Sequence, residues 1–140
     1  MYKLTSATVP KRVESANKWL WRPWYVYEAY KKKWFEVLKL FVKVAPGVPS
    51  RKRKVVITAR RRTALDYDNL VAGCKPILDF LKKWFWIRDD SPLWIEVEYR
   101  QEKSEKEETV LEIFGARKEP DPIRRPTKYV SLEPRDPWRS

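Results

Sequence analysis

The chain of 140 residues has no histidine and a single cysteine, Cys74. These absences exclude an internal disulfide, a zinc site built from cysteines, and every catalytic or metal site that needs an imidazole. Enzyme chemistry would have to use carboxylates, lysine, arginine, tyrosine, hydroxyl groups or a hard metal ion, and no organic cofactor is indicated. The apolar runs are short, whereas a membrane-spanning helix needs about 20 apolar residues. We expect a protein of the reducing cytoplasm without a membrane segment or a secretory signal peptide.

Basic residues predominate, since 31 Lys and Arg face 19 Asp and Glu and give a formal net charge of +12. The excess lies in residues 1–64, with 17 basic and 3 acidic side chains, whereas residues 65–100 hold 5 basic and 7 acidic ones. A basic region of this size favours a polyanion as partner, because Lys and Arg replace the counterions that condense on phosphates. The alternative is a highly charged surface without such a partner.

The candidate DNA contacts are basic or amide side chains between residues 11 and 62. They are Lys11, Arg12, Asn17, Lys18, Arg22, Arg51, Lys52, Arg53, Lys54, Arg60, Arg61 and Arg62. Trp19, Trp21 and Trp24 lie among them and could stack on exposed bases. Such aromatic residues more often belong to a core or a dimer interface.

The hydrophobic periodicity predicts an α+β fold, a small mixed sheet with two main helices packed against it, in the order β-α-β-α-β-β. Strands are expected at 3–9, 54–60, 93–99 and 109–114, helices at 24–44 and 69–84, and loops at 10–22 and 48–54. Pro76 predicts a kink or break in the second helix, because proline lacks an amide N–H. Residues 1–114 form the predicted domain, and five prolines with mixed charge predict an irregular tail over 115–140.

Four carboxylates, Asp66, Asp68, Asp89 and Asp90, form an acidic island in this basic chain. Asp66 and Asp68 precede the second helix, and an extended segment 84–90 is long enough to return along a helix of about 22 Å. It could thus bring Asp89 and Asp90 to the same end. Carboxylates that converge need a counter-charge, which a divalent cation such as magnesium supplies.

Each of these acids also has a purely structural alternative. Asp68 could cap the helix, Asp89 and Asp90 could form a turn, and Asp66 could pair with the arginines at 60–62.

Lys75 shares a face of an unbroken helix with Asp68 and Asp79, at offsets of seven and four residues. It could contact a scissile phosphate, or form an ordinary surface ion pair with Asp79.

The stretch that begins at Arg60, RRRTALDYDNLVAGCKPILDFLKKWFWIRDDSP, resembles the RusA family of Holliday junction resolvases. The features that carry the resemblance are Asp-x-Asp-Asn-Leu at 66–70, a helix with Lys75 and Asp79, and Asp89-Asp90. Asn17-Lys18, followed by aromatic residues, also resembles the family's N-terminal region. Some members place the lysine two residues after the leucine, where this chain has Ala72.

The resemblance implies a magnesium-dependent endonuclease, with manganese as an alternative ion, that resolves four-way DNA junctions by paired symmetric nicks in recombination and repair. It implies Asp66, Asp68 and Asp90 as metal ligands and catalytic residues, and Lys75 as the essential lysine. Asp89 would be a further metal ligand or part of a turn, and Asn69 and Asp79 would support the ligands from outside the set. The expected setting is the cytoplasm, for a nucleoid-associated or a phage-encoded protein.

A homodimer is expected, because a four-way junction has approximate two-fold symmetry and one chain offers a single acidic island. The eight tryptophans fit an apolar interface, for which helix 24–44 is the leading candidate. Two other functions stay open, a non-catalytic nucleic-acid-binding protein on the same scaffold and a metal nuclease for other branched DNA or RNA. The acidic island favours a nuclease over a pure binder, which has no use for negative charge facing phosphates.

Overall fold

β3, Arg53–Arg61, is the most buried strand of the sheet. Val55, Ile57 and Ala59 are buried toward the helices, and β-branched and small apolar side chains of this kind suit a covered strand. The sheet has four strands in the order β1-β5-β3-β4. Its other strands are β1 (Tyr2–Val9), β4 (Ile95–Lys103) and β5 (Glu108–Gly115). The computed structural model describes residues 2–115 and 123–124.

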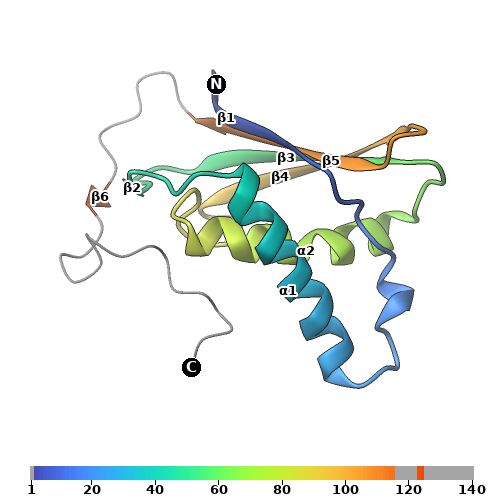
Figure 1. Cartoon of the computed structure of the whole chain (residues 1–140). Coiled ribbons are helices and arrows are strands. Elements are labelled where there is room, and N and C mark those ends of the chain that lie inside the picture. Colours follow the sequence, from blue (N-terminus) through green and yellow to red (C-terminus); the bar gives the residue numbers. More distant parts are fainter. Residues whose placement is uncertain (1, 116–122, 125–140) are drawn as a thin grey trace.

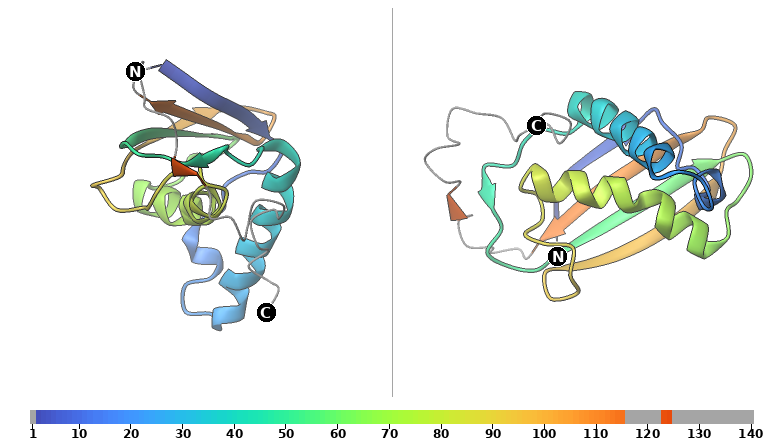
Figure 2. Two further views of the ribbon diagram at one scale, coloured as in Figure 1. Left: turned by 90° about the vertical axis from the view of Figure 1, so that its left-hand side faces the viewer. Right: turned by 90° about the horizontal axis from the view of Figure 1, so that it is seen from below.

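The sheet is mixed, and its one parallel pair positions the candidate site. β4 runs parallel to β3, whereas β5 is antiparallel to both β3 and β1. Parallel neighbours need a crossover connection, and α2 (Tyr67–Lys83) supplies it. Both helices lie on the same face of the sheet, and within the described residues no helix covers the other face, which we name the open face (Figures 1 and 2). The predicted α+β class, with a small mixed sheet and two main helices, is confirmed.

The core lies between this sheet and the two helices. α1 (Trp24–Phe41) buries Trp34, Phe35 and Leu38, and the Phe35 ring meets the Phe80 ring of α2 edge-on at 5.3 Å. α2 is one continuous helix from Tyr67 to Lys83 with Pro76 inside it, so of the predicted kink or break the break is wrong. Packing of the apolar face of α2 on the sheet outweighs the hydrogen bond that proline cannot make.

Gly73 fits the close approach of α2 to the segment that follows β1. A Cβ atom at this position would lie 2.3 Å from the carbonyl oxygen of Glu14 and 2.6 Å from Val13 Cγ1. The buried Tyr30 hydroxyl donates to the Gly73 carbonyl at 2.8 Å and accepts from the Glu14 amide at 3.1 Å. Glycine at 73 therefore allows a contact that no other residue would permit without displacement.

The short elements depart from the expected loops. Residues 10–22 contain the 3-10 helix η1 (Ala16–Lys18), and β2 (Gly47–Val48) pairs antiparallel with β6 (Ile123–Arg124). The tail predicted for 115–140 otherwise lies outside the described residues. Among the described helices, none has the length and apolar composition to cross a membrane.

Candidate functional site

Asp66 and Asp68 lie in the connection between β3 and α2. Asp66 is the N-cap residue of α2, with its carbonyl accepting a hydrogen bond from the Leu70 amide at 2.9 Å, and Asp68 is in the first turn. Arg61 and Lys103 are register partners, so the carboxyl ends of the parallel strands coincide here. Ligands commonly bind beyond the carboxyl ends of parallel strands, and the helix dipole favours negative charge at this position.

Both carboxylates are exposed, and neither forms a hydrogen bond or an ion pair with another residue in the described part of the chain. The Asp66 side chain makes no capping hydrogen bond. Within residues 2–115, neither Asp66 nor Asp68 forms an ion pair, and the arginines at 60–62 have other partners. Neither acid therefore takes the capping or arginine-pairing role considered from the sequence.

Asp89 and Asp90 lie toward the opposite end of the parallel pair. Ile95 at the start of β4 is in register with Arg53 at the start of β3, and the 9 residues of β3 extend about 26 Å. Asp89 binds Lys82, in the last turn of α2, at 3.0 Å. The predicted convergence of all four acids is therefore wrong within one chain, because a parallel β4 requires the chain to return to the amino end of β3.

Local structure around Asp89 agrees with this placement. Residues 84–94 form turns and bends rather than the extended segment that convergence required. The Lys82 ammonium, with the Asp90 amide that donates to Asp89 Oδ1 at 2.9 Å, holds the pKa of Asp89 below its ordinary value. Asp89 is thus part of a surface ion pair and a tight turn.

The acids fit magnesium only in part. Among the described residues, no group of three or more His, Cys, Asp or Glu side chains is placed to hold a metal ion. The set of Asp66, Asp68 and Asp90 therefore does not fit one ion within a single chain. Asp66 and Asp68 as a pair fit the chemistry, because magnesium is often held by one or two carboxylates and completed by water and substrate phosphate. Asn69, half-buried, adjoins this pair.

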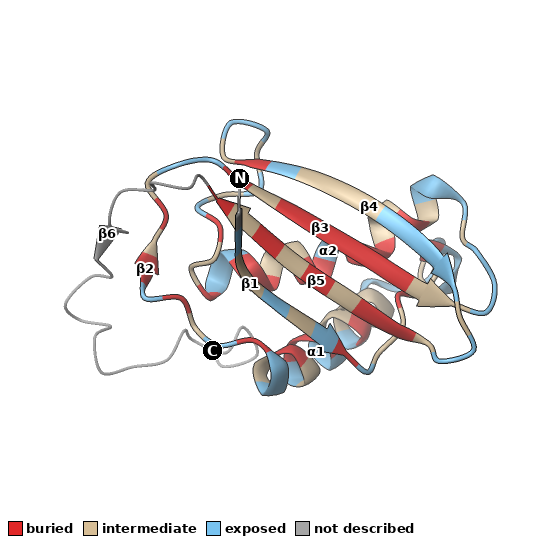
Figure 3. Ribbon diagram, turned by 90° about the horizontal axis from the view of Figure 1, so that it is seen from above, coloured by how far each residue is buried: buried red, intermediate tan, exposed pale blue. Residues whose placement is uncertain are grey.

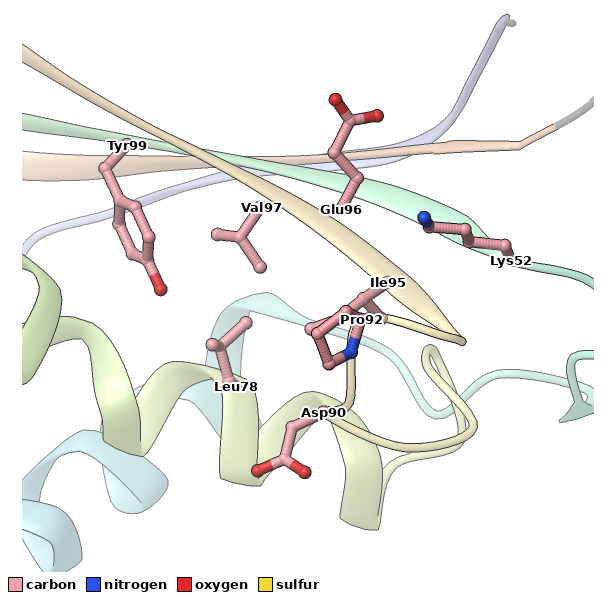
Figure 4. A pocket seen from close by; sticks show the side chains of 8 residues that line it. All are labelled: Lys52, Leu78, Asp90, Pro92, Ile95, Glu96, Val97 and Tyr99. Atoms are coloured by element: carbon pink, nitrogen blue, oxygen red, sulfur yellow. The ribbon is translucent and has the colours of Figure 1, made fainter.

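Asp90 lines a pocket of about 380 Å³ between α2 and β4 (Figure 4). Lys52 and Tyr99 line the same pocket, one from each end of the view. Burial raises the pKa of Tyr99 to about 12, and its ring meets the Tyr67 ring edge-on at 6.0 Å. The two tyrosines thus connect the Asp90 pocket with the N-terminus of α2. Sequence reasoning assigned neither of them, although Tyr67 stands between the two aspartates of the motif.

Lys75 lies on the exposed face of α2, without the predicted partner. Asp79 pairs with Lys31 of α1 at 3.5 Å, so the expected Lys75–Asp79 pair is not formed. Asp68, Lys75 and Lys82 are all exposed and follow one line along the helix, since seven residues make almost two turns. We name this line, Asp68, Lys75 and Lys82, the α2 ridge.

Acidic side chains neutralise several of the predicted DNA contacts. Many of these acids belong to β4, β5 and the turn between them. In β3, Lys54 and Arg60 alternate with Val55, Ile57 and Ala59, which face the helices, so the strand pairs of these two cations lie on the open face. Figure 3 views the sheet from this side. The pairs are Arg12 with Glu14 and Glu107, Lys18 with Glu14, Lys54 with Glu98, Arg60 with Glu102 and Glu108, and Arg62 with Glu105. A cation that already has a carboxylate partner releases fewer counterions when it meets a phosphate.

Two further predicted contacts are used inside the fold. Arg53 is only 5% exposed, and its guanidinium donates to the Trp86 carbonyl at 2.8 Å, so its predicted contact with DNA is wrong. The Arg61 guanidinium donates to the carbonyl oxygens of Val13 and Thr63.

The remaining candidates differ in how accessible they are. Lys11 lies 5.5 Å from the centre of the Trp34 ring, and burial lowers its pKa. Asn17 is exposed in η1. Arg22, Arg51 and Lys52 are exposed and form no ion pair within the described residues, which makes them the best-placed cations for phosphate.

No protein-family model matches the chain, and no curated protein matches it. The resemblance to the RusA family therefore rests on the motif residues themselves. The structure adds two observations. Asp66 and Asp68 are exposed at the N-terminus of α2 without an ion pair among the described residues. The third carboxylate, Asp90, lies toward the other end of that helix.

Proposed function

We propose that this protein is a magnesium-dependent endonuclease that hydrolyses phosphodiesters in branched DNA, with the four-way junction as its substrate. The observation that carries the proposal is the free state of Asp66 and Asp68. Asp66 and Asp68, two residues apart at one helix end, bring negative charge together, and no Lys or Arg among the described residues pairs with either of them to offset it. A magnesium ion together with a phosphate would do so. Magnesium, when bound there, would polarise the phosphodiester and activate water.

The chain's own residues would position the DNA. Arg51 and Lys52 precede β3 and would hold phosphates at its amino end. Lys75, on the exposed face of α2 two turns from Asp68, would offset negative charge that develops on the phosphate. Arg51 and Lys52 would thus serve DNA binding and Lys75 the chemical step, and a substitution can remove each role separately.

The third acid enters the proposal through the homodimer. Asp68 and Lys82, the partner of Asp89, are 14 residues apart on α2, or about 21 Å along its axis. A two-fold axis beside the α2 ridge would run two such helices antiparallel and leave Lys75 of each subunit open to DNA. Asp90 of the partner subunit would then approach Asp66 and Asp68. We propose this interface in place of the helix 24–44 that the sequence suggested.

Cleavage of a labelled mobile four-way junction tests the function itself. With magnesium we expect paired nicks in opposed strands, and with EDTA we expect none. Duplex and flap DNA serve as substrate controls. Binding to the junction without cleavage in magnesium or manganese would favour the non-catalytic alternative. Faster cleavage of the flap would favour a nuclease for other branched DNA.

A subunit-mixing experiment tests the shared site. The variant with Asp66→Asn and Asp68→Asn is mixed with Asp90→Asn after each is shown to be inactive alone. If acids from two chains form each site, every mixed dimer has one intact site, and the mixture regains about one quarter of the wild-type nicking. The products should be single nicks rather than paired ones. An active wild type with an inactive mixture would contradict the shared site and leave the nuclease proposal standing.

A further inference from the structure

The loop between η1 and α1 carries large apolar side chains into solvent. We name residues 20–25, with the sequence LWRPWY, the aromatic tip. Trp21 is 100% exposed and Trp24 77% exposed, and Leu20 and Tyr25 are exposed as well. Figure 1 shows that the N-terminal end of α1 projects away from the sheet. Of the two alternatives to stacking, a core or a dimer interface, the core is therefore wrong for Trp21 and Trp24.

The backbone holds the tip in a defined turn. Trp21 has φ of 63°, in the left-handed region that a bulky side chain rarely adopts. The Arg22 amide donates to the Trp19 carbonyl at 3.0 Å, and Pro23 fixes the start of α1. Trp19 anchors the loop from inside, since its ring stacks on Tyr30 with centroids 4.5 Å apart. Strain of this kind concentrates at functional positions, and here its effect is to present Trp21 to solvent.

The charge around the tip favours a polyanion over a second copy of the chain. No acidic residue occurs between Glu14 and Glu28, while Lys18 and Arg22 both lie in this stretch. Lys18 pairs with Glu14 at 3.4 Å, and Arg22 is exposed without an ion pair among the described residues. Two copies meeting tip to tip would bring the same positive charges together, whereas a nucleic-acid strand offers a phosphate for Arg22 beside a base for each ring.

We infer that the aromatic tip is a stacking site for unpaired bases of DNA, with Arg22 on an adjoining phosphate. The inference rests on the proposed function only in taking DNA as the partner, and it does not depend on cleavage. Base stacking on an aromatic ring tolerates any sequence, because every base has a π face. The site would therefore distinguish unpaired from paired nucleotides rather than one sequence from another.

Binding of fluorescent oligonucleotides tests the inference. Affinities for a thymine 20-mer and for a duplex of equal length are measured with the wild type, Trp21→Ala and Trp24→Ala. Each variant should lose about 5- to 100-fold in affinity for the single strand and stay within about twofold for the duplex. Trp21→Tyr should keep most of the single-strand affinity, whereas Trp21→Leu should not, because leucine is apolar but has no π face. Leu40→Ala, at an exposed position on the same helix, is the matched control and should change neither affinity.

Three results would overturn the inference. The first is equal loss of single-strand and duplex affinity, and the second is no loss at all. The third is a wild type that sediments as a dimer while Trp21→Ala is a monomer, which would make the tip a protein interface. A wild type that binds neither oligonucleotide nor a junction would overturn the proposed function as well, whereas a junction-cutting enzyme with unchanged Trp21→Ala affinities would overturn only the stacking site.

Discussion

The open face of the sheet and the ends of its parallel strands both carry many charges, but in different states. On the open face, Lys54 and Arg60 are held by carboxylates of the neighbouring strands. At the strand ends, Lys52 before β3 and Asp66 and Asp68 after it have no ion pair within the described residues. The comparison shows that the number of charges in a sequence does not define a binding surface, because pairing within the fold decides which charges are free to meet a ligand.

The sharpest way to break this comparison is to remove free and paired cations in matched numbers. The double variant Arg51→Ala with Lys52→Ala should weaken junction binding about tenfold or more. The slope of log K against log salt should also fall by about 1.8, since each lost phosphate contact contributes about 0.9. Lys54→Ala with Arg62→Ala removes two paired cations and should change the slope by less than about 0.5. Equal slopes for the two double variants would contradict the distinction between free and paired charge.

Glu108 tests what the paired face does for stability. Its side chain is only 6% exposed, and Arg60 Nη1 donates to it at 2.7 Å. Glu108→Gln should lower the free energy of unfolding by about 1 kcal/mol, discounted because Arg60 is partly in solvent. Urea denaturation measures this loss. Glu105→Gln, at a side chain 96% exposed, should have no effect, and junction affinity should hold in both variants.

The smallest expected effect is on the stability at alkaline pH and concerns Tyr99, which lines the pocket with Asp90 and contacts the Tyr67 ring. Burial raises the pKa of Tyr99 to about 12, whereas an unfolded tyrosine loses its proton near pH 10. The unfolded state therefore binds fewer protons between these values, so stability falls as the pH rises through them. Tyr99→Phe should reduce this alkaline loss by less than about 1 kcal/mol, because Tyr99 is only partly buried. Its pH dependence near pH 7 should match the wild type, and an unchanged alkaline slope would contradict the assignment.

The elements of the fold followed from the sequence because apolar periodicity records which face of each segment is buried. The strand at 93–99 was predicted from its alternation, and the structure has β4 at Ile95–Lys103. Alternation does not record strand direction, however, and the parallel pairing of β4 with β3 separated Asp89 from Asp66. The predicted meeting of the four acids considered only whether segment 84–90 is long enough to reach Asp66, and not the direction of the strand that follows it.

The sequence predicted which residues form the candidate site better than it predicted which partners the charged residues contact. Asp66 and Asp68 stand at the N-terminus of α2 as expected, because the motif directly precedes the apolar stripe of that helix. The pairing of Arg60 with Glu102 and Glu108 depends on strands more than 40 residues apart in sequence. No local pattern indicates such a contact. The sequence therefore overestimated the basic surface that is open to DNA.

The most direct test of the central claim compares Asp66→Asn and Asp68→Asn with Glu105→Gln, whose exposed carboxylate already pairs with Arg62. Cleavage of a four-way junction in magnesium and binding to it without metal are measured side by side. We predict that each of the first two variants loses cleavage by at least about 100-fold, since even outer partners of metal ligands can cost that much. Both should bind the junction as well as the wild type does, and Glu105→Gln should still cut. Wild-type cleavage by Asp66→Asn and Asp68→Asn would contradict the claim that these free carboxylates form the catalytic site.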